Sequence, residues 1–213
     1  MLPEEYEQRR RLPRELQAAP FREPDFSFTL RDATDADLAQ VRDIYKHYVL
    51  NSTVSFDERP KTIAQWRATF VRVTKLGMPF LVAESATGTI LGFAFVQPWK
   101  QRSAYRHTVE DSIYLGPTAV GRGLGGALLA LLIERCQEAG IREIVAVIAD
   151  QQTEGSIRLH ERFGFVEAGR MGRVGFKFGR WLGIVMMQKS LESPKERAKL
   201  AKRAAREERR ASS

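Results

Sequence analysis

The chain has 213 residues, of which 43% are hydrophobic, and a formal net charge of +8. This length and hydrophobic content suffice for one domain with a full core and charged appendages. Its single cysteine, Cys136, excludes an internal disulfide framework and a cysteine-based zinc site, and we expect a buried, inert thiol. No apolar run approaches the roughly 18 residues of a membrane span, and the N-terminus lacks the apolar core of a signal peptide. A cytoplasmic location without a membrane partner is therefore the expectation.

The first half of the chain predicts a charged extension followed by the start of a domain. Residues 1–25 are charged and interrupted by prolines, so we place them outside the core. A domain is predicted over residues 26–191, with a strand at 26–31, a helix that begins near Thr34, and a second helix at 62–76. Thr34 and Asp37 have the spacing of a capping box, and Gly77 suits the end of the second helix. Strands are predicted at 79–84 and 90–97.

The second half alternates strands with helices. We predict a strand at 109–115, a helix at 127–138, an apolar strand at 144–149 that is covered on both faces, and a short helix at 156–163. Two more strands are predicted, one that begins at residue 164 and one at 181–188. This order indicates an α/β fold with a mixed central sheet and helices on both faces. The basic tail, residues 192–213, is predicted to be helical or disordered, and a contact with nucleic acid is an alternative that the pattern does not support.

A glycine-rich turn lies between the strand at 109–115 and its following helix. Glycine lets the backbone approach an anion closely, and the unpaired N–H groups at a helix start attract negative charge. The turn therefore predicts a phosphate cradle, with glycines that only shape a turn as the alternative. It consists of Gly121, Arg122, Gly123, Leu124, Gly125 and Gly126.

Three kinds of phosphate site compete for this turn. Gly121, Gly123 and Gly126 satisfy the dinucleotide pattern, but five residues separate them from the strand, and Asp150 falls later than the ribose-binding acid should. A Walker site is excluded because no Gly-Lys-Ser/Thr closes the loop. The third kind is a coenzyme A pyrophosphate site, in which the strand edge at 113–115 would bind the pantetheine arm.

Four segments carry a resemblance to a known family. Residues 120–126 resemble the acetyl-CoA motif of the GNAT N-acetyltransferases. Residues 106–110, 156–165 and 174–181 resemble, in the same order, the phosphinothricin and methionine-sulfone N-acetyltransferase branch of that family. The resemblance covers residues 28–191, and it implies a GNAT-like fold, acetyl-CoA as the cofactor and a homodimer.

Acetyl transfer to an amine requires that the amine lose a proton, that the oxyanion be stabilised and that the thiolate leave. The resemblance implies that Glu110 and His160 are the catalytic pair. By charge pattern alone, Glu110 would be an ordinary strand glutamate and His160 a surface histidine. A backbone N–H near Tyr114 is the expected oxyanion donor, and no metal is expected.

The predicted binding residues fall into two groups. Arg106, His107, Lys177 and Arg180 are candidates to bind an anionic amino-acid substrate, although Lys177 and Arg180 would equally suit a subunit contact. Gln152 or Thr153 occupies the place where the branch has an asparagine that touches coenzyme A. The predicted cofactor-binding residues are Ile113, Tyr114, Leu115, Gly121, Arg122, Gly123, Leu124, Gly125, Gly126, Gln152 and Thr153.

These features predict an acetyl-CoA-dependent N-acetyltransferase that acts on a small-molecule, amino-acid-like amine by direct attack on the thioester. Three alternatives stay open. In the first, the acetyl acceptor is a polyamine, an antibiotic or a protein amine. In the second, the domain is a GNAT-like binding module whose basic tail contacts nucleic acid. The third is a nicotinamide enzyme.

Overall fold

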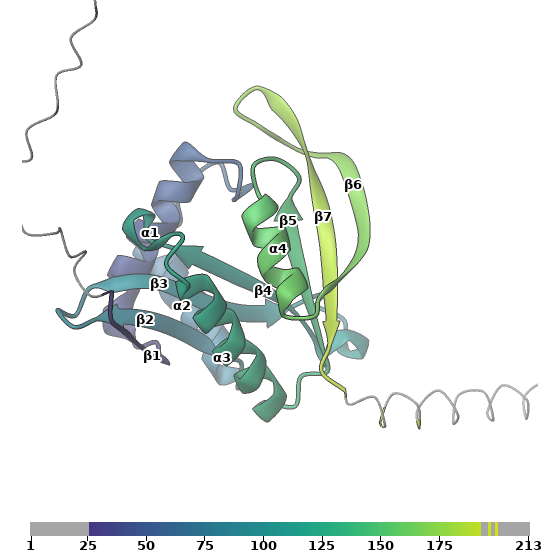
Figure 1. The fold of residues 1–213 in the computed structure, drawn as a ribbon, viewed down its shortest axis with the longest axis horizontal. Coiled ribbons are helices and arrows are strands. Elements are labelled where there is room, and N and C mark those ends of the chain that lie inside the picture. Colours follow the sequence, from purple (N-terminus) through teal and green to yellow (C-terminus); the bar gives the residue numbers. More distant parts are fainter. Residues whose placement is uncertain (1–25, 193–195, 197–198, 200–213) are drawn as a thin grey trace, which may run out of the picture.

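The computed structural model describes residues 26–192 together with residues 196 and 199 (Figure 1). The predicted extension, 1–25, and the predicted tail, apart from three residues, lie outside the described residues. The elements follow in the order β1 (Phe28–Asp32), α1 (Leu38–Asn51), α2 (Ile63–Lys75), β2 (Phe80–Ser85), β3 (Ile90–Pro98), β4 (Thr108–Leu115), α3 (Leu124–Glu138), β5 (Glu143–Ala149), α4 (Glu154–Arg162), β6 (Val166–Lys177) and β7 (Arg180–Ser190).

The strands form one seven-stranded sheet in the order β1-β2-β3-β4-β5-β7-β6. Only the β4–β5 pair is parallel, and every other neighbouring pair is antiparallel. The predicted α/β fold with a mixed sheet is therefore confirmed, and so is the predicted order of helices and strands.

Two hydrophobic clusters lie on the two faces of the sheet. On one face, α1 and α2 pack over an aromatic cluster that includes Trp66 and Phe93, both fully buried. On the other face, α3 and α4 cover an aliphatic cluster to which α3 contributes Leu128 and Leu132, four residues apart. Helices thus cover both faces, as predicted, and Figure 1 shows α3 and α4 side by side.

Local signals place the first two helices. The Asp37 carboxylate accepts hydrogen bonds from the N–H and the hydroxyl of Thr34, which completes the predicted capping box. Thr62 and Gln65 form a second capping box at the start of α2. Gly77 follows the end of α2 with a φ of 67°, a conformation that glycine adopts without strain. These contacts set where the two helices begin and end.

Two boundaries differ from the prediction. Helix α3 begins at Leu124 rather than at 127, so Gly125 and Gly126 belong to the helix. Strand β6 extends to Lys177, far beyond the predicted start at 164–168. Most of its residues are exposed, so its sequence lacks the alternation of apolar and polar residues that predicts a half-buried strand. Pairing with β7 holds β6 in place.

Within the described residues, no helix combines the length and the apolar character that a membrane crossing needs. The same residues contain no group of three or more side chains arranged to hold a metal ion. The predicted burial of Cys136 is confirmed, since its side chain lies inside the second cluster. Burial, aided by the charge of Asp111, raises the pKa of this thiol to about 12.

Candidate active site

The most informative feature of the sheet is the separation of β4 from β5. The two strands pair only where residues Thr108–Glu110 lie beside Glu143–Val145. Both strands continue past this point, to Leu115 and Ala149, and Figure 1 shows them diverging. One edge of β4 is therefore left without a strand partner in the middle of the sheet.

The ladder between β3 and β4 determines which backbone groups face this gap. The N–H of Gly116 donates to Leu91 at 2.7 Å, and the N–H of Trp99 donates to Thr108 at 3.1 Å. Because antiparallel pairs alternate, the even-numbered residues of β4 bond to β3 and the odd-numbered ones face away from it. The backbone groups of Ile113 therefore face the gap.

The same alternation determines which backbone N–H groups near Tyr114 face the gap. It directs the N–H of Tyr114 toward β3, whereas the N–H groups of Ile113 and Leu115 face the gap. The carbonyl of Leu115 is already occupied, because it accepts a hydrogen bond of 2.7 Å from the hydroxyl of Tyr48. Ile113 and Leu115 are thus the better placed backbone donors.

The glycine turn lies at the end of the gap, where α3 begins. Gly121 and Gly123 have φ values of 79° and 81°, and a Cβ at either position would meet no atom within 4 Å. Their role is conformational. Gly123 is also the N-cap of α3, so no capping side chain satisfies the first N–H groups of this helix. The start of α3 is therefore left without a capping side chain, and anion binding at this turn stays a prediction.

Gly125 and Gly126 lie in the first turn of α3, where α4 packs against it. A Cβ on Gly125 would lie 3.4 Å from Leu159, and one on Gly126 would lie 3.8 Å from Phe163. Both are ordinary contact distances, so the packing of the two helices does not require glycine at either position.

Arg122 lies in the turn beside the first described residue of the chain. Its guanidinium carbon is 4.7 Å from the centroid of the Phe26 ring, which is a cation–π contact. Phe26 in turn packs against Phe28 of β1, with 5.7 Å between the ring centroids. The guanidinium of Arg122, a predicted phosphate ligand, therefore lies over the Phe26 ring at the start of the domain.

Glu110 lies at the inner end of the gap, in the last residue pair that joins β4 to β5. It is half-buried, on the face of the sheet that α1 and α2 cover. Burial raises the pKa of the Glu110 carboxyl, the neighbouring charge of Asp111 adds to this, and Lys100 opposes it. A raised pKa brings a carboxylate closer to the range that a general base needs.

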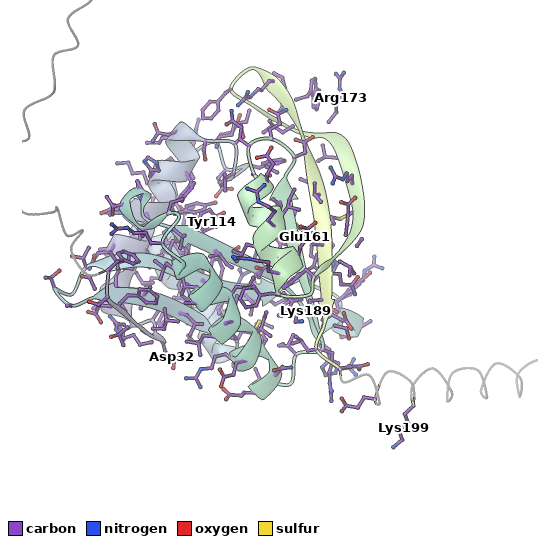
Figure 2. The ribbon with its side chains drawn as sticks, viewed as in Figure 1. Asp32, Tyr114, Glu161, Arg173, Lys189 and Lys199 are labelled. Carbon is purple, nitrogen blue, oxygen red and sulfur yellow. The ribbon has the colours of Figure 1, made fainter. Side chains whose placement is uncertain are left out.

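Aromatic and polar side chains line the same face beyond Glu110. The rings of Tyr45 and Tyr114 meet edge to face at 5.0 Å. The Tyr45 hydroxyl donates to Asp57 at 2.7 Å and lies 2.8 Å from the hydroxyl of Ser55. These contacts connect the loop after α1 to β4. Figure 2 shows Tyr114 among the side chains inside the molecule.

His160 does not lie beside Glu110. Its side chain projects from α4 to Asp111, which occupies the opposite face of the sheet from Glu110 because successive strand residues alternate. His160 is also buried, with only 3% of its surface exposed. The two residues of the predicted catalytic pair are therefore separated by the sheet.

The four predicted substrate-binding residues do not form one cluster within this chain. Arg106 and His107 are exposed just before β4, near the start of β5, where Glu143 pairs with Ser190 of β7. Lys177 and Arg180 lie at the β6–β7 turn, toward the opposite end of β5. The two pairs thus lie toward different ends of the strands, and a role of these four residues in substrate binding stays a prediction.

The loop before α4 also differs from expectation. Thr153 is buried, and its hydroxyl donates to the carbonyl of Ala149 rather than facing outward. Gln152 is exposed and has a φ of 60°. Of the two predicted coenzyme A contacts, only the Gln152 side chain is accessible.

Two groups of functional interest were absent from the predicted site. Asp111 was missed because it follows Glu110 on the other face of β4, and a buried strand aspartate carries no motif. Tyr45 and Asp57 were missed because they lie far before the glycine turn in the chain. Tyr45 belongs to the buried side of α1 and Asp57 to the loop after it, so neither residue carried a motif.

Comparison with known proteins decides the family. The model of the acetyltransferase (GNAT) domain matches residues 30–186, which is more than half of the chain. The chain belongs to the GNAT acetyltransferase family. The predicted family, fold and enzyme class are thereby confirmed.

This GNAT protein has similar relatives among characterised enzymes. It is 43% identical over 165 residues to a phosphinothricin N-acetyltransferase of Alcaligenes faecalis, covering 78% of this chain and 83% of the relative. It is 41% identical over 166 residues to an L-methionine sulfoximine/L-methionine sulfone acetyltransferase of Pseudomonas aeruginosa, covering 78% and 96%. The predicted branch is therefore confirmed as well.

Solved structures resemble this GNAT protein over the same region. An acetyltransferase of Salmonella typhimurium, solved with its cofactor acetyl-CoA, gives a TM-score of 0.76 at 37% identity, covering 78% of this chain and 95% of that one. A phosphinothricin acetyltransferase of Sinorhizobium meliloti, in complex with acetyl-CoA, gives 0.74 at 43% identity, covering 77% and 88%.

Proposed function

We propose that this GNAT enzyme transfers an acetyl group from acetyl-CoA to the amine of a small amino-acid-like substrate of the phosphinothricin or methionine sulfone/sulfoximine type. The observation that carries the proposal is the gap between β4 and β5, with Glu110 at its inner end and the glycine turn at its outer end. Acetyl-CoA supplies the activated thioester. This chain's residues bind it, orient it and accept the proton of the amine.

The residues present fit this cofactor. The exposed backbone edge of β4 at Ile113 and Leu115 offers hydrogen bonds to an extended amide-containing arm. The uncapped start of α3, together with Arg122, suits a pyrophosphate. A nicotinamide cofactor gains no support, because both solved relatives named above hold acetyl-CoA.

Glu110 is the proposed general base. Its half-buried carboxylate, whose pKa is raised, lies where the gap begins and would take a proton from the attacking amine. The amine then attacks the thioester directly. Cys136 supports this route, because the only cysteine of the chain is buried and its raised pKa keeps it a thiol, which is a poor nucleophile.

His160 keeps a place in the proposal, but not as a partner of Glu110. Its two ring nitrogens are occupied by a carboxylate and a backbone carbonyl, and no ring atom is left to reach a substrate in this conformation. A direct role in proton transfer stays a prediction that His160→Ala tests by its effect on kcat.

The substrate class rests on the two relatives, which act on amino-acid analogues by name. Side chains of both signs lie near the face of β4 that carries Glu110. Asp57 is half-buried beside Tyr45, and the Lys61 amine is 3.9 Å from the Asp57 carboxylate. A zwitterionic acceptor fits such a mixed surface, and a polyamine, an antibiotic or a protein amine is the alternative.

A homodimer through the β6–β7 hairpin is part of the proposal. Strand β6 is the outermost strand of the sheet, and large apolar side chains of the hairpin are exposed. Apolar surface of this kind commonly marks a protein interface. The exposed apolar residues are Val166, Met171, Val174, Phe176, Phe178 and Trp181.

One assay tests the proposed function. The protein is mixed with acetyl-CoA and, separately, with phosphinothricin, methionine sulfoximine, methionine sulfone, spermidine, an aminoglycoside or a lysine peptide, and free thiol is followed. We expect release with the amino-acid analogues, and Glu110→Gln should reduce it on the order of 10²–10⁴-fold. Glu161→Gln, an exposed change on α4, is the control. Release only with one of the other amines would replace the proposed substrate class, and none with any amine would contradict the proposal.

A further inference from the structure

The contact between His160 and Asp111 is a buried polar pair beneath α4. The Nε2 atom of His160 lies 3.1 Å from Oδ2 of Asp111, and its Nδ1 atom lies 2.8 Å from the carbonyl oxygen of Ser156. The two side chains are only 4% and 2% exposed. The ring also meets Phe165 edge to face at 4.9 Å, so it is fixed on all sides.

These contacts limit the protons that the ring can carry. A backbone carbonyl can only accept, so Nδ1 must donate to Ser156. An ionised carboxylate can also only accept, so Nε2 needs a second proton to bond to Asp111. We infer that His160 is held as an imidazolium by Asp111, and that this buried ion pair positions α4 against β4 beside the acetyl-CoA site.

The place of the pair in the fold supports a positioning role. Asp111 is the first residue of β4 after the last pair with β5, so the ion pair lies where the gap opens. Beside His160, Leu159 of α4 lies against Gly125 in the first turn of α3, and Phe163 at the end of α4 lies against Gly126. The ion pair thus connects the strand that carries Glu110 to the helix that packs on the glycine turn.

The electrostatics agree with a charged pair. Burial disfavours an imidazolium, but the hydrogen bond and charge of Asp111, with the Ser156 carbonyl, outweigh burial and raise the pKa of His160. Two other ionisable groups feel the charge of Asp111, namely Glu110 on the opposite face of β4 and Cys136 on α3. Burial raises the pKa of each, and the charge of Asp111 adds to it.

Stability alone does not account for the arrangement. The second carboxylate oxygen of Asp111, Oδ1, is buried and has no hydrogen-bond partner within the described part of the chain. An unsatisfied buried acceptor and a buried ion pair both cost solvation free energy. An apolar pair would fill the same space without that cost, so orientation is the property that the pair supplies. Because the acetyl-CoA site belongs to the proposed function, this inference rests on it.

Nitrogen NMR of the full-length protein tests the protonation. At about pH 7.5 we expect both ring nitrogens of His160 to be protonated, with the signal assigned by its loss in His160→Gln. The exposed His47 and His107 provide internal references. In Asp111→Asn the ring should be neutral with its proton on Nδ1, since the amide can donate to Nε2. A singly protonated His160 ring in the unmodified protein would overturn the inference.

Acetyl-CoA binding tests the positioning, measured by calorimetry without any acceptor. Asp111→Ala should weaken binding on the order of 10-fold to 100-fold, the effect of a small misplacement at a site. Asp111→Asn should restore most of the affinity, and Val109→Ala, on the same face of β4, is the control for lost packing. If Asp111→Ala does not fold, His160→Gln takes its place.

The outcomes separate this inference from the proposed function. Unchanged acetyl-CoA affinity in a folded Asp111→Ala or His160→Gln protein would overturn the positioning role. Equal losses in Asp111→Ala and Val109→Ala would also overturn it. If the unmodified protein binds acetyl-CoA as stated but transfers the acetyl group to no amine, the proposed function fails and the inference holds.

Discussion

The Nζ atom of Lys177 lies 2.6 Å from the carbonyl oxygen of Ser55 and 2.9 Å from that of Ser52. These bonds join the end of β6 to the loop after α1, across more than a hundred residues of sequence. The ring of Phe56 in that loop lies so close to Gly175 that a Cβ there would clash with it. The hairpin thus shapes the loop whose Asp57 contacts Tyr45.

We expect Lys177→Met to loosen this loop. The change removes the amine but keeps most of the unbranched side chain, and it leaves the carbonyls of Ser52 and Ser55 without this donor, at a cost of about 1–3 kcal/mol. The KM for the amine should rise more than the KM for acetyl-CoA, because the loop lies on the Glu110 face. Steady-state kinetics and urea unfolding measure both effects. Lys75→Met, an exposed lysine at the end of α2, is the control. Unchanged kinetics for both substrates would show that the loop does not contact the amine.

Gly123→Ala and Gly125→Ala should have different effects. At Gly123 the φ of 81° strains an alanine by about 1–2 kcal/mol, although a Cβ would meet no atom. At Gly125 a Cβ would make an ordinary contact with Leu159, and alanine favours a helix over glycine by up to about 1 kcal/mol. Gly123→Ala should lower both the melting temperature and the affinity for acetyl-CoA, and Gly125→Ala should lower neither. Equal behaviour of the two variants would contradict the assignment of a conformational role to Gly123.

The Asp37 carboxylate should contribute to stability in acid. Its hydrogen bonds with Arg31 lower the pKa of Asp37 to about 2, from 3.8, against the opposing effect of burial. A carboxylate whose pKa is lower in the folded state stabilises the fold above its unfolded pKa, and the contribution disappears as the pH falls through the folded pKa.

The expected contribution is about 1–2 kcal/mol after allowance for the partly exposed Arg31. Asp37→Asn should therefore lose less stability than the unmodified protein when the pH falls from about 4 to about 2. Urea unfolding at several pH values measures this, with Asp43→Asn, an exposed change on α1, for comparison. If the free energy of unfolding falls equally with pH in both variants and the unmodified protein, the Arg31–Asp37 pair is not an acid-sensitive contact.

The pH dependence of catalysis should report on Glu110. A general base works when it is deprotonated, so kcat/KM should rise with pH through the raised pKa of Glu110. Lys100 lowers that pKa, so Lys100→Met should move this limb of the profile to higher pH. Lys46→Met, on α1, should leave the limb in place. If neither change moves the limb, another group must take the proton.

The oligomeric state should depend on the hairpin. The rings of Phe176 and Trp181 meet edge to face with 5.4 Å between their centroids, and both side chains are about half exposed. The double change Phe176→Ser/Trp181→Ser should convert a dimer into a monomer in light scattering. Val71→Ser, an equally exposed apolar residue on α2, should not. Should the unmodified protein itself be a monomer, the proposed interface is wrong.

The turn at Gly121 and Gly123 shows what a sequence can reveal. Hydrophobic periodicity, capping pairs and a glycine turn are local signals, and each arises from the backbone and its immediate neighbours. They predicted the order of the helices and strands, the mixed sheet and the cradle. The resemblance in four ordered segments then identified the family, which the comparisons confirmed.

What local signals could not reveal is which residues share a face or an end of the sheet. Glu110 and His160 belong to neighbouring motifs, yet strand alternation places Glu110 on one face of the sheet and the partner of His160, Asp111, on the other. The amine of Lys177, a candidate for substrate binding or a subunit contact, donates to two backbone carbonyls, which its sequence motif does not reveal.

The amino-acid sequence alone determined the element order and the glycine turn, because these depend on spacing along the chain, and its resemblance to a known family implied the enzyme class. Only the tertiary structure decided that β4 and β5 separate after Glu110, that Asp111 holds the ring of His160, and that the basic residues at 106–107 and 177–180 lie at opposite ends of the sheet. The physical reason is that strand register, side-chain alternation and burial are set by contacts between segments far apart in the chain.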